Sequence, residues 1–194
     1  MGDATRMRTT NSEATAFRTG LVAVLDVGST KTICLIGRAE PGNLRVLGAA
    51  LRETGGIKSA TVTSIVEAEE SIREAVAAAE NHADARIQNV LISVACGSPL
   101  SIKGRATAAL DGSLVSDGHL HALLREGRSK CQMEGYEIIQ AAPTSYVVDE
   151  ARGVKNPSGM FCQRIGVSMH AVGVRPSPLA NLKLAIERCH LSTV

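Results

Sequence analysis

Aromatic side chains are nearly missing from this sequence. Phe, Tyr and Trp make up 2% of its 194 residues, and Trp is absent. Proteins that bind unpaired nucleic-acid bases stack them on several aromatic rings, so this class of function is disfavoured. The core must be built from Val, Ile, Leu and Ala, since apolar residues still make up 44% of the chain. A chain this long buries roughly 70% of its unfolded surface, so one large or two small domains are expected.

An excess of charge of one sign is also missing. The 21 Lys and Arg residues nearly balance the 19 Asp and Glu residues, and the two signs are interspersed. The sequence shows no concentrated basic face, so we expect no nucleic-acid partner. No apolar run approaches the roughly 18 residues that cross a bilayer. The polar residues 1–20 lack the apolar core of a signal peptide, and we predict that they form a disordered arm.

Cysteine pairs with the spacing of a metal or redox site are likewise missing. The five cysteines lie far apart at Cys34, Cys96, Cys131, Cys162 and Cys189. Reduced thiols in a cytosolic protein are the simplest interpretation. Cys96 is next to a glycine but lacks the surrounding pattern of a nucleophile elbow, so we expect a structural role for it.

The apolar patterns predict a mixed α/β chain. Three apolar runs with short connections, at 21–25, 33–36 and 44–47, predict antiparallel strands in a meander. A helix is predicted from Ser64, which with Glu67 fits a capping box. Further strands are expected at 89–96, 101–110, 136–149 and 165–174, together with a helix capped by Asp117 and a helix from Pro178 to Cys189. The strand at 136–149 should be bent or at an edge because of Pro143. In the strand at 165–174 Val172 and Val174 are shifted by one, as in a bulge.

The residues with the most chemical character connect the first two predicted strands. Gly28 permits a tight turn with close backbone approach to a ligand, and the amides and hydroxyls of Ser29 and Thr30 can face phosphate oxygens. Lys31 supplies a compact positive charge, and Asp26 at the strand exit is suited to hold Mg²⁺ through water. A P-loop is excluded, because that motif needs an earlier glycine and a following helix. The alternative is an ordinary hairpin turn whose polar side chains satisfy local amides.

Several segments resemble the FtsA family of actin-like bacterial cell-division proteins. The stretch LVAVLDVGSTKTICLIG resembles the first phosphate motif of that family, and RIQNVLISVACG is similar to the start of its inserted subdomain. Residues Gly153–Met160 resemble a turn typical of the family, and Ala185–Cys189 resembles its return helix. The loop at Lys58–Ala60 departs from the family pattern, because it lacks further acidic or glycine residues.

This resemblance implies a fold and a domain plan. The fold class is α/β (α+β), a partial actin-like or ribonuclease-H-like subdomain with an inserted SHS2-type sheet-plus-helix subdomain. Residues 21–87 are expected to form the first part of the actin-like subdomain, 88–175 the insert, and 176–194 the return helix. We expect the insert to be the better-folded half, and residues 21–51 to leave an exposed sheet edge.

The resemblance also implies a function. It makes Asp26, Gly28, Ser29, Thr30 and Lys31 the ATP-binding residues, with Asp26 at the Mg²⁺, and it places no catalytic residue in this chain. FtsA proteins link FtsZ filaments of the Z ring to the cytoplasmic face of the cell membrane. They contact FtsZ and the membrane through later regions, and they contact other FtsA molecules and later division proteins through the insert. ATP acts chiefly as a conformational ligand, with slow hydrolysis at most.

Two alternatives remain at this point, both within the same superfamily. One is a sugar or small-carboxylate kinase, and the other is an actin-like pilus-assembly adaptor. The chain ends at Val194, before the second phosphate loop and the adenosine-binding segment of such proteins, so it resembles an N-terminal fragment. We therefore expect this fragment to have an incomplete site, weak ATP binding and no enzymatic activity.

Overall fold

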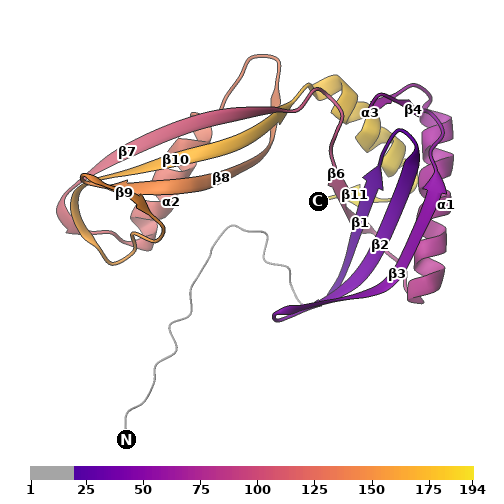
Figure 1. Ribbon diagram of the computed structural model, residues 1–194, viewed down its shortest axis with the longest axis horizontal. Coiled ribbons are helices and arrows are strands. Elements are labelled where there is room, and N and C mark those ends of the chain that lie inside the picture. Colours follow the sequence, from indigo (N-terminus) through magenta and orange to yellow (C-terminus); the bar gives the residue numbers. More distant parts are fainter. Residues whose placement is uncertain (1–19) are drawn as a thin grey trace, which may run out of the picture. The chain divides into compact units, whose positions relative to one another are not determined.

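The computed structural model describes residues 20–194, which form two compact units (Figure 1). Unit 1 contains residues 20–55, 66–93 and 185–194, and unit 2 contains residues 56–65 and 94–184. The predicted arm at 1–20 lies almost wholly outside the described residues. No helix within residues 20–194 has the length and apolar character needed to span a membrane.

Unit 1 is built on a five-stranded sheet with the order β11-β6-β1-β2-β3. Its elements are β1 (Gly20–Val27), β2 (Lys31–Glu40), β3 (Asn43–Glu53), α1 (Ile65–Ala83), β6 (Asn89–Ser93) and β11 (Ser192–Thr193). The predicted meander is confirmed, since β1 pairs with β2 and β2 with β3, both antiparallel. After α1 the chain returns as β6, parallel to β1 on its other side. A parallel neighbour requires such a crossover.

This pairing corrects one expectation for unit 1 and agrees with another. The strand at 89–96 was expected to open the insert at about residue 88, but β6 belongs to the sheet of unit 1, and the second unit resumes only at Val94. The exposed edge expected on strands 21–51 is present at β3, which ends the sheet order, while β6 pairs with the other side of β1. Periodicity identified both strands but did not reveal their partners.

One face of this sheet is covered by α1 (Figure 1). The buried face of the helix includes Ile72, Ala75 and Ala79. A Cβ atom on Gly48 of β3 would lie 2.3 Å from the carbonyl oxygen of Ala79, so helix and strand approach too closely for any side chain there. The capping residue predicted at Ser64 immediately precedes the helix.

Unit 2 is built on a four-stranded antiparallel sheet with the order β7-β10-β8-β9 and one helix against it (Figure 1). Its elements are β4 (Ile57–Lys58), β5 (Thr61–Val62), β7 (Leu100–Leu114), α2 (Asp117–Ser129), β8 (Glu137–Val148), β9 (Ala151–Val154), β10 (Phe161–Val174) and α3 (Pro176–Glu187), whose last three residues belong to unit 1. The core between sheet and α2 includes Ile102, Leu123, Ile165, Val167 and Met169.

Three details of unit 2 differ from the sequence-based expectations. The N-cap of α2 is Ser116 rather than Asp117. The Ser116 hydroxyl accepts a hydrogen bond from the amide of His119, and the Ser116 amide donates one to Nδ1 of the His119 ring. The register against β8 does shift between Val172 and Gly173, but the extra residue is Ile139 of β8, and the alternation of β10 itself continues through buried Ala171 and Gly173. The last helix begins at Pro176 and ends at Glu187.

The prediction of a bent or edge strand around Pro143 is confirmed. The register of β8 against β10 shifts between Ser145 and Pro143, which leaves Thr144 as an extra residue. On its other side β8 pairs with β9 only at 146–148, so among the described residues no second strand pairs with β8 at the proline. A proline lacks an amide donor and is tolerated at such a place.

Candidate functional site

The predicted strand–turn–strand lies at the end of the β1–β2 hairpin. Gly28, Ser29 and Thr30 form the turn, and β2 starts at Lys31. The Gly28 amide donates to the carbonyl oxygen of Lys31 at 2.9 Å, and a Cβ atom on Gly28 would lie 3.1 Å from that oxygen. The turn therefore favours glycine for steric reasons. Its first amide closes the turn and is not one of the Ser29 and Thr30 amides that are predicted to face a phosphate.

The turn is braced from the end of β3. The Thr54 amide donates to the carbonyl of Thr30 at 3.1 Å, and the hydroxyl of Thr54 lies 2.7 Å from that of the fully buried Thr32. Further along, the Gly55 amide donates to the Ser71 hydroxyl of α1 at 2.8 Å. These bonds hold the loop in one conformation against the sheet and the helix. Such fixed backbone is what a preorganised anion site requires.

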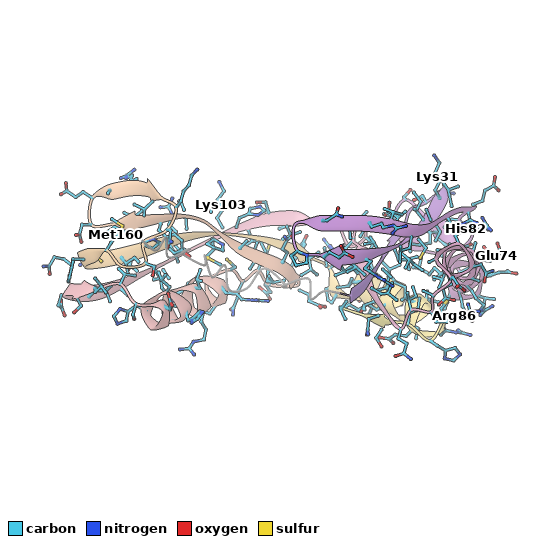
Figure 2. The ribbon with its side chains drawn as sticks, turned by 90° about the horizontal axis from the view of Figure 1, so that it is seen from below. Lys31, Glu74, His82, Arg86, Lys103 and Met160 are labelled. Atoms are coloured by element: carbon cyan, nitrogen blue, oxygen red, sulfur yellow. The ribbon has the colours of Figure 1, made fainter. Side chains whose placement is uncertain are left out.

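Asp26 and Lys31 lie on the same face of the sheet, the one opposite α1. The side chains of β1 alternate, so Asp26 lies on the opposite face of the sheet from the buried Leu25 and Val27. Asp26 is exposed, whereas the sequence predicted that the strand it ends is buried. Lys31 is exposed at the start of β2 and projects from the ribbon (Figure 2). The carboxylate and the ammonium group are thus available to a ligand in solvent at one end of this face.

Two residues that the sequence analysis missed share this end of the face. The register places Ser93 of β6 beside Asp26, and Glu53 of β3 opposite Lys31. Only the parallel pairing of β6 with β1 brings Ser93 there. The four side chains form a polar set at the end of a face that is otherwise apolar, with Leu35 41% exposed and Leu51 50% exposed.

This polar set fits a magnesium–phosphate group in its chemistry. Mg²⁺ is usually bound by one or two carboxylates together with waters and substrate phosphates, and Asp26 supplies a carboxylate of this kind. Within residues 20–194 no cluster of three or more His, Cys, Asp or Glu side chains forms a metal cage. The protein part of such a site would therefore be Asp26 with the turn and Lys31.

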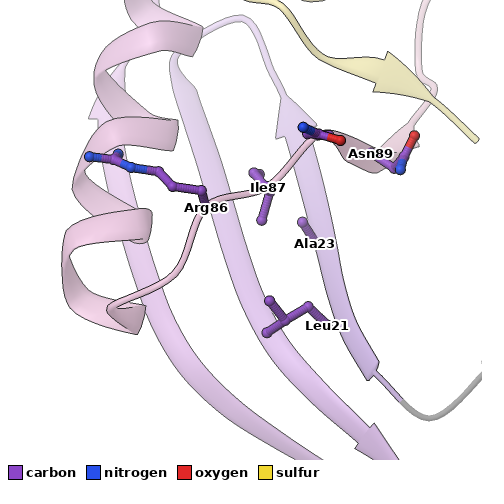
Figure 3. Close-up of a pocket in the computed structure, with 6 residues that line it drawn as sticks. Leu21, Ala23, Arg86, Ile87 and Asn89 are labelled. Carbon is purple, nitrogen blue, oxygen red and sulfur yellow. The ribbon is translucent and has the colours of Figure 1, made fainter.

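A hollow of about 270 Å³ in unit 1 lies at the other end of β1 (Figure 3). It is lined by Leu21 and Ala23 of β1 and by residues 86–89 between α1 and β6. The Arg86 guanidinium turns toward α1, where it pairs with Glu80, and the Ile87 amide donates to the same carboxylate at 2.9 Å (Figure 3). The hollow is thus separate from the phosphate-type turn, and its one cation is already paired.

The cysteines show no sign of nucleophilic chemistry. All five are free thiols, and Cys34, Cys96, Cys131 and Cys162 are buried. Burial, with a smaller contribution from the Glu80 carboxylate, raises the pKa of the Cys34 thiol to about 11. Burial likewise raises the pKa of Cys96. A Cβ atom on neighbouring Gly97 would lie 2.8 Å from the backbone of Arg175, so this dipeptide has a packing role.

Comparison with known proteins gives a family match and related sequences. Residues 97–173 match the model of the SHS2 domain inserted in FtsA. The chain is 31% identical over 186 residues to cell division protein FtsA of Agrobacterium fabrum, covering 90% of this chain and 42% of the relative. FtsA of Neisseria meningitidis is 25% identical, over 89% of this chain and 42% of the relative. FtsA of Escherichia coli is 22% identical, over 88% and 41%. The chain thus spans less than half the length of these relatives.

A solved structure shares the fold. The PilM-PilN type IV pilus biogenesis complex contains a chain that superposes with a TM-score of 0.55 and 14% identity, covering 89% of this chain and 46% of that chain. The SHS2 match and this superposition confirm the expected fold class, an α/β (α+β) actin-like subdomain with an SHS2-type insert.

Proposed function

We propose, from the premise that this chain belongs to the FtsA family, that it is part of an actin-like cell-division adaptor for which ATP is a conformational ligand. The whole protein assembles with FtsZ in the Z ring and is held at the cytoplasmic face of the cell membrane. The relatives named as FtsA support the division role. The observation that supports the nucleotide role is the braced turn with Asp26 and Lys31 on one sheet face.

In this proposal each residue of the turn has a distinct part. Gly28 has no side chain, so a phosphate can approach the backbone there closely. The exposed Ser29 and Thr30 offer hydroxyl groups, and Lys31 offers a charge to the phosphate oxygens. Asp26 would hold the magnesium ion through water. In this proposal Asp26 is assigned to the magnesium ion and no residue of the turn serves as a general base, so the arrangement is suited to nucleotide binding rather than to fast hydrolysis.

Calorimetric titration of the full-length gene product with Mg²⁺-ATP tests the nucleotide role. A charge-assisted hydrogen bond contributes about 1.5–3 kcal/mol, so Lys31→Ala should weaken ATP binding about tenfold or more. The matched control is Lys58→Ala, an exposed lysine in β4 of unit 2. Unchanged affinity in the Lys31 variant would contradict the proposal. The chain 1–194 alone should bind ATP only weakly, and micromolar affinity would contradict that expectation.

A pilus-assembly adaptor is the alternative that the shared fold with the PilM-containing complex allows. Binding of an FtsZ tail peptide to the full-length product distinguishes the two, because only the division adaptor should bind it. A kinase assay with small acceptors addresses the enzyme hypothesis, since fast phosphate transfer would contradict an adaptor role.

A further inference from the structure

One face of the unit 2 sheet gathers positive charge. The core lies on the α2 side, with Ile102, Val167 and Met169 buried there. Strand alternation therefore places Lys103 and Arg105 of β7 on the opposite, open face, where both are exposed. Lys103 projects away from the sheet (Figure 2). The sequence analysis found no concentrated basic face, and only strand pairing produces this one.

The neighbouring strands add to this charge without balancing it. The register places His170 of β10 directly beside Lys103, and its ring lies 2.8 Å from the Ser101 hydroxyl. The other open-face positions that pair with Ser101–Ala109 hold Arg164, Gly166, Ser168 and Val172 on β10, and Val147, Ser145, Ala142 and Gln140 on β8. None of them is Asp or Glu. Three carboxylates lie just beyond these positions: Asp111 on β7, Glu137 on β8, which accepts from Lys183 at 3.4 Å, and Asp149, which accepts from the amides of Gln163 and Arg164.

The same strand is an open sheet edge. β7 pairs with β10 along most of its 15 residues, and within the described residues no strand pairs with its other side. A long unpaired edge is a template for another strand. Two copies pairing antiparallel about Gly104 would place Lys103 of each copy opposite Arg105 of the other, and like charges placed opposite each other are destabilising. Pairing about Thr107, the middle of β7, would instead place Lys103 opposite Asp111. The cationic part of the edge therefore disfavours the same part of a second copy and favours a strand of opposite charge.

The chemistry of the face excludes two other anionic partners. A membrane-binding surface usually presents Trp, Phe or Leu for insertion, whereas the residues between the cations here are small, such as Gly166, Ser168 and Ser145. Single-stranded nucleic acid is bound by stacking on aromatic rings, and none of the open-face positions is aromatic. This open sheet face, with small side chains between its cationic ones, suits an extended polypeptide.

We propose that the outer edge of β7 and the adjoining open face bind an acidic, extended polypeptide segment. The segment adds as a strand beside β7, as in known cases of strand addition, and its alternate carboxylates lie against Lys103 and Arg105. This inference rests on the contacts with other proteins that the resemblance to the FtsA family implies for the insert, and it specifies the surface and the chemistry of the partner.

The test uses the full chain and a fluorescent peptide of alternating Glu and Thr, about as long as β7, with the Gln-Thr peptide as its uncharged match. At low ionic strength the Glu peptide should bind at least tenfold more tightly. Lys103→Glu with Arg105→Glu should weaken that binding tenfold or more, and Lys103→Gln with Arg105→Gln should do so to a smaller extent. The charge-matched control is Arg45→Glu with Arg125→Glu, which changes exposed arginines on β3 and α2 and should bind as the parent does.

A second readout locates the peptide. Amide exchange along residues 101–109 should slow when the Glu peptide binds, while exchange along the β3 edge should not change. Equal binding of the Glu and Gln peptides, or full binding by the Lys103→Glu/Arg105→Glu variant, would overturn the proposal. So would anionic vesicles or a single-stranded oligonucleotide that bind through these two residues while the Glu peptide does not. Neither residue belongs to the nucleotide turn, so such a failure leaves ATP and FtsZ-peptide binding by the full-length product unaffected.

Discussion

The two units use the same layering of helix on sheet but differ in what the uncovered face of each sheet presents. In unit 1 the face opposite α1 carries exposed Leu35, Val46 and Leu51, with a polar set only at its end near Asp26 and Lys31. In unit 2 the face opposite α2 carries small and cationic side chains. Exposed contiguous apolar surface marks a place where another surface packs. The open face of unit 1 is therefore suited to packing against another surface, whereas that of unit 2 is suited to water or to a polar partner.

Introducing a side chain where helix and sheet touch should give the largest effects. A Cβ atom on Gly48 would lie 2.3 Å from backbone of α1, and one on Gly104 would lie 2.5 Å from Cys131 Sγ and 2.8 Å from backbone of α2. Overpacking costs about 1–3 kcal/mol and occasionally more, so Gly48→Val and Gly104→Val should each lower the free energy of unfolding by about 3 kcal/mol. Urea denaturation with amide exchange measures this for each unit.

The same pair of variants tests whether the units are independent. Gly48→Val should reduce protection in the strands of unit 1 and leave β7 and β10 of unit 2 protected, and Gly104→Val should do the reverse. Gly42→Asn is the control, because Gly42 has φ +76° with nothing within 4 Å and Asn tolerates that conformation. Equal loss of protection in both units from either variant would mean that they unfold as one.

Alkaline pH should affect unit 1 through Cys34. Its pKa is raised from about 9 in the unfolded chain to about 11, first by burial and then by Glu80. The folded state thus holds the proton more tightly, and this contribution to stability is complete below pH 9 and is lost as the pH rises toward 11. The free energy of unfolding of Cys34→Ala should fall less steeply over that range, although it starts lower because of the cavity. Parallel pH profiles for parent and variant would contradict this.

A smaller effect is expected at the start of α2. Replacing an N-cap serine by alanine costs about 1 kcal/mol, so Ser116→Ala should lower the stability of unit 2 by that amount in urea denaturation. Asp117→Asn should cost less, because a first-turn carboxylate contributes only about 0.3–1 kcal/mol through the helix dipole. A larger loss of stability in Asp117→Asn than in Ser116→Ala would show that Asp117 is the N-cap. Amide protection in unit 1 should not respond to either change.

Substitutions on the apolar face of unit 1 should change stability least but should clearly change self-association in solution. Leu35→Thr with Leu51→Thr alters exposed strand positions and should change the free energy of unfolding by no more than about 0.5 kcal/mol each. Sedimentation velocity at rising concentration should show weaker self-association than in the parent chain. Val66→Ala, at a 64% exposed position of α1, is the control and should associate as the parent does. If Val66→Ala alone weakened self-association, the associating surface would be α1 and not the sheet.

Local sequence alone determined the elements and the turn. The apolar runs identified β1, β2 and β3, the period of 3.6 residues identified α1, and Gly28 between two strands identified the tight turn, because each of these signals is contained within a few adjacent residues. The same local signals, with the resemblance to FtsA proteins, indicated the family and selected Asp26 and Lys31 as candidate site residues.

Only the tertiary structure decided which strands are neighbours. Periodicity states which face of a strand is buried but not what lies beside it, so it did not show that β6 joins β1 and brings Ser93 next to Asp26. The two-residue strands β4, β5 and β11 are too short to carry any periodic signal. The cationic face of unit 2 has the same origin, because Lys103 and His170 are distant in sequence and become adjacent only through the pairing of β7 with β10.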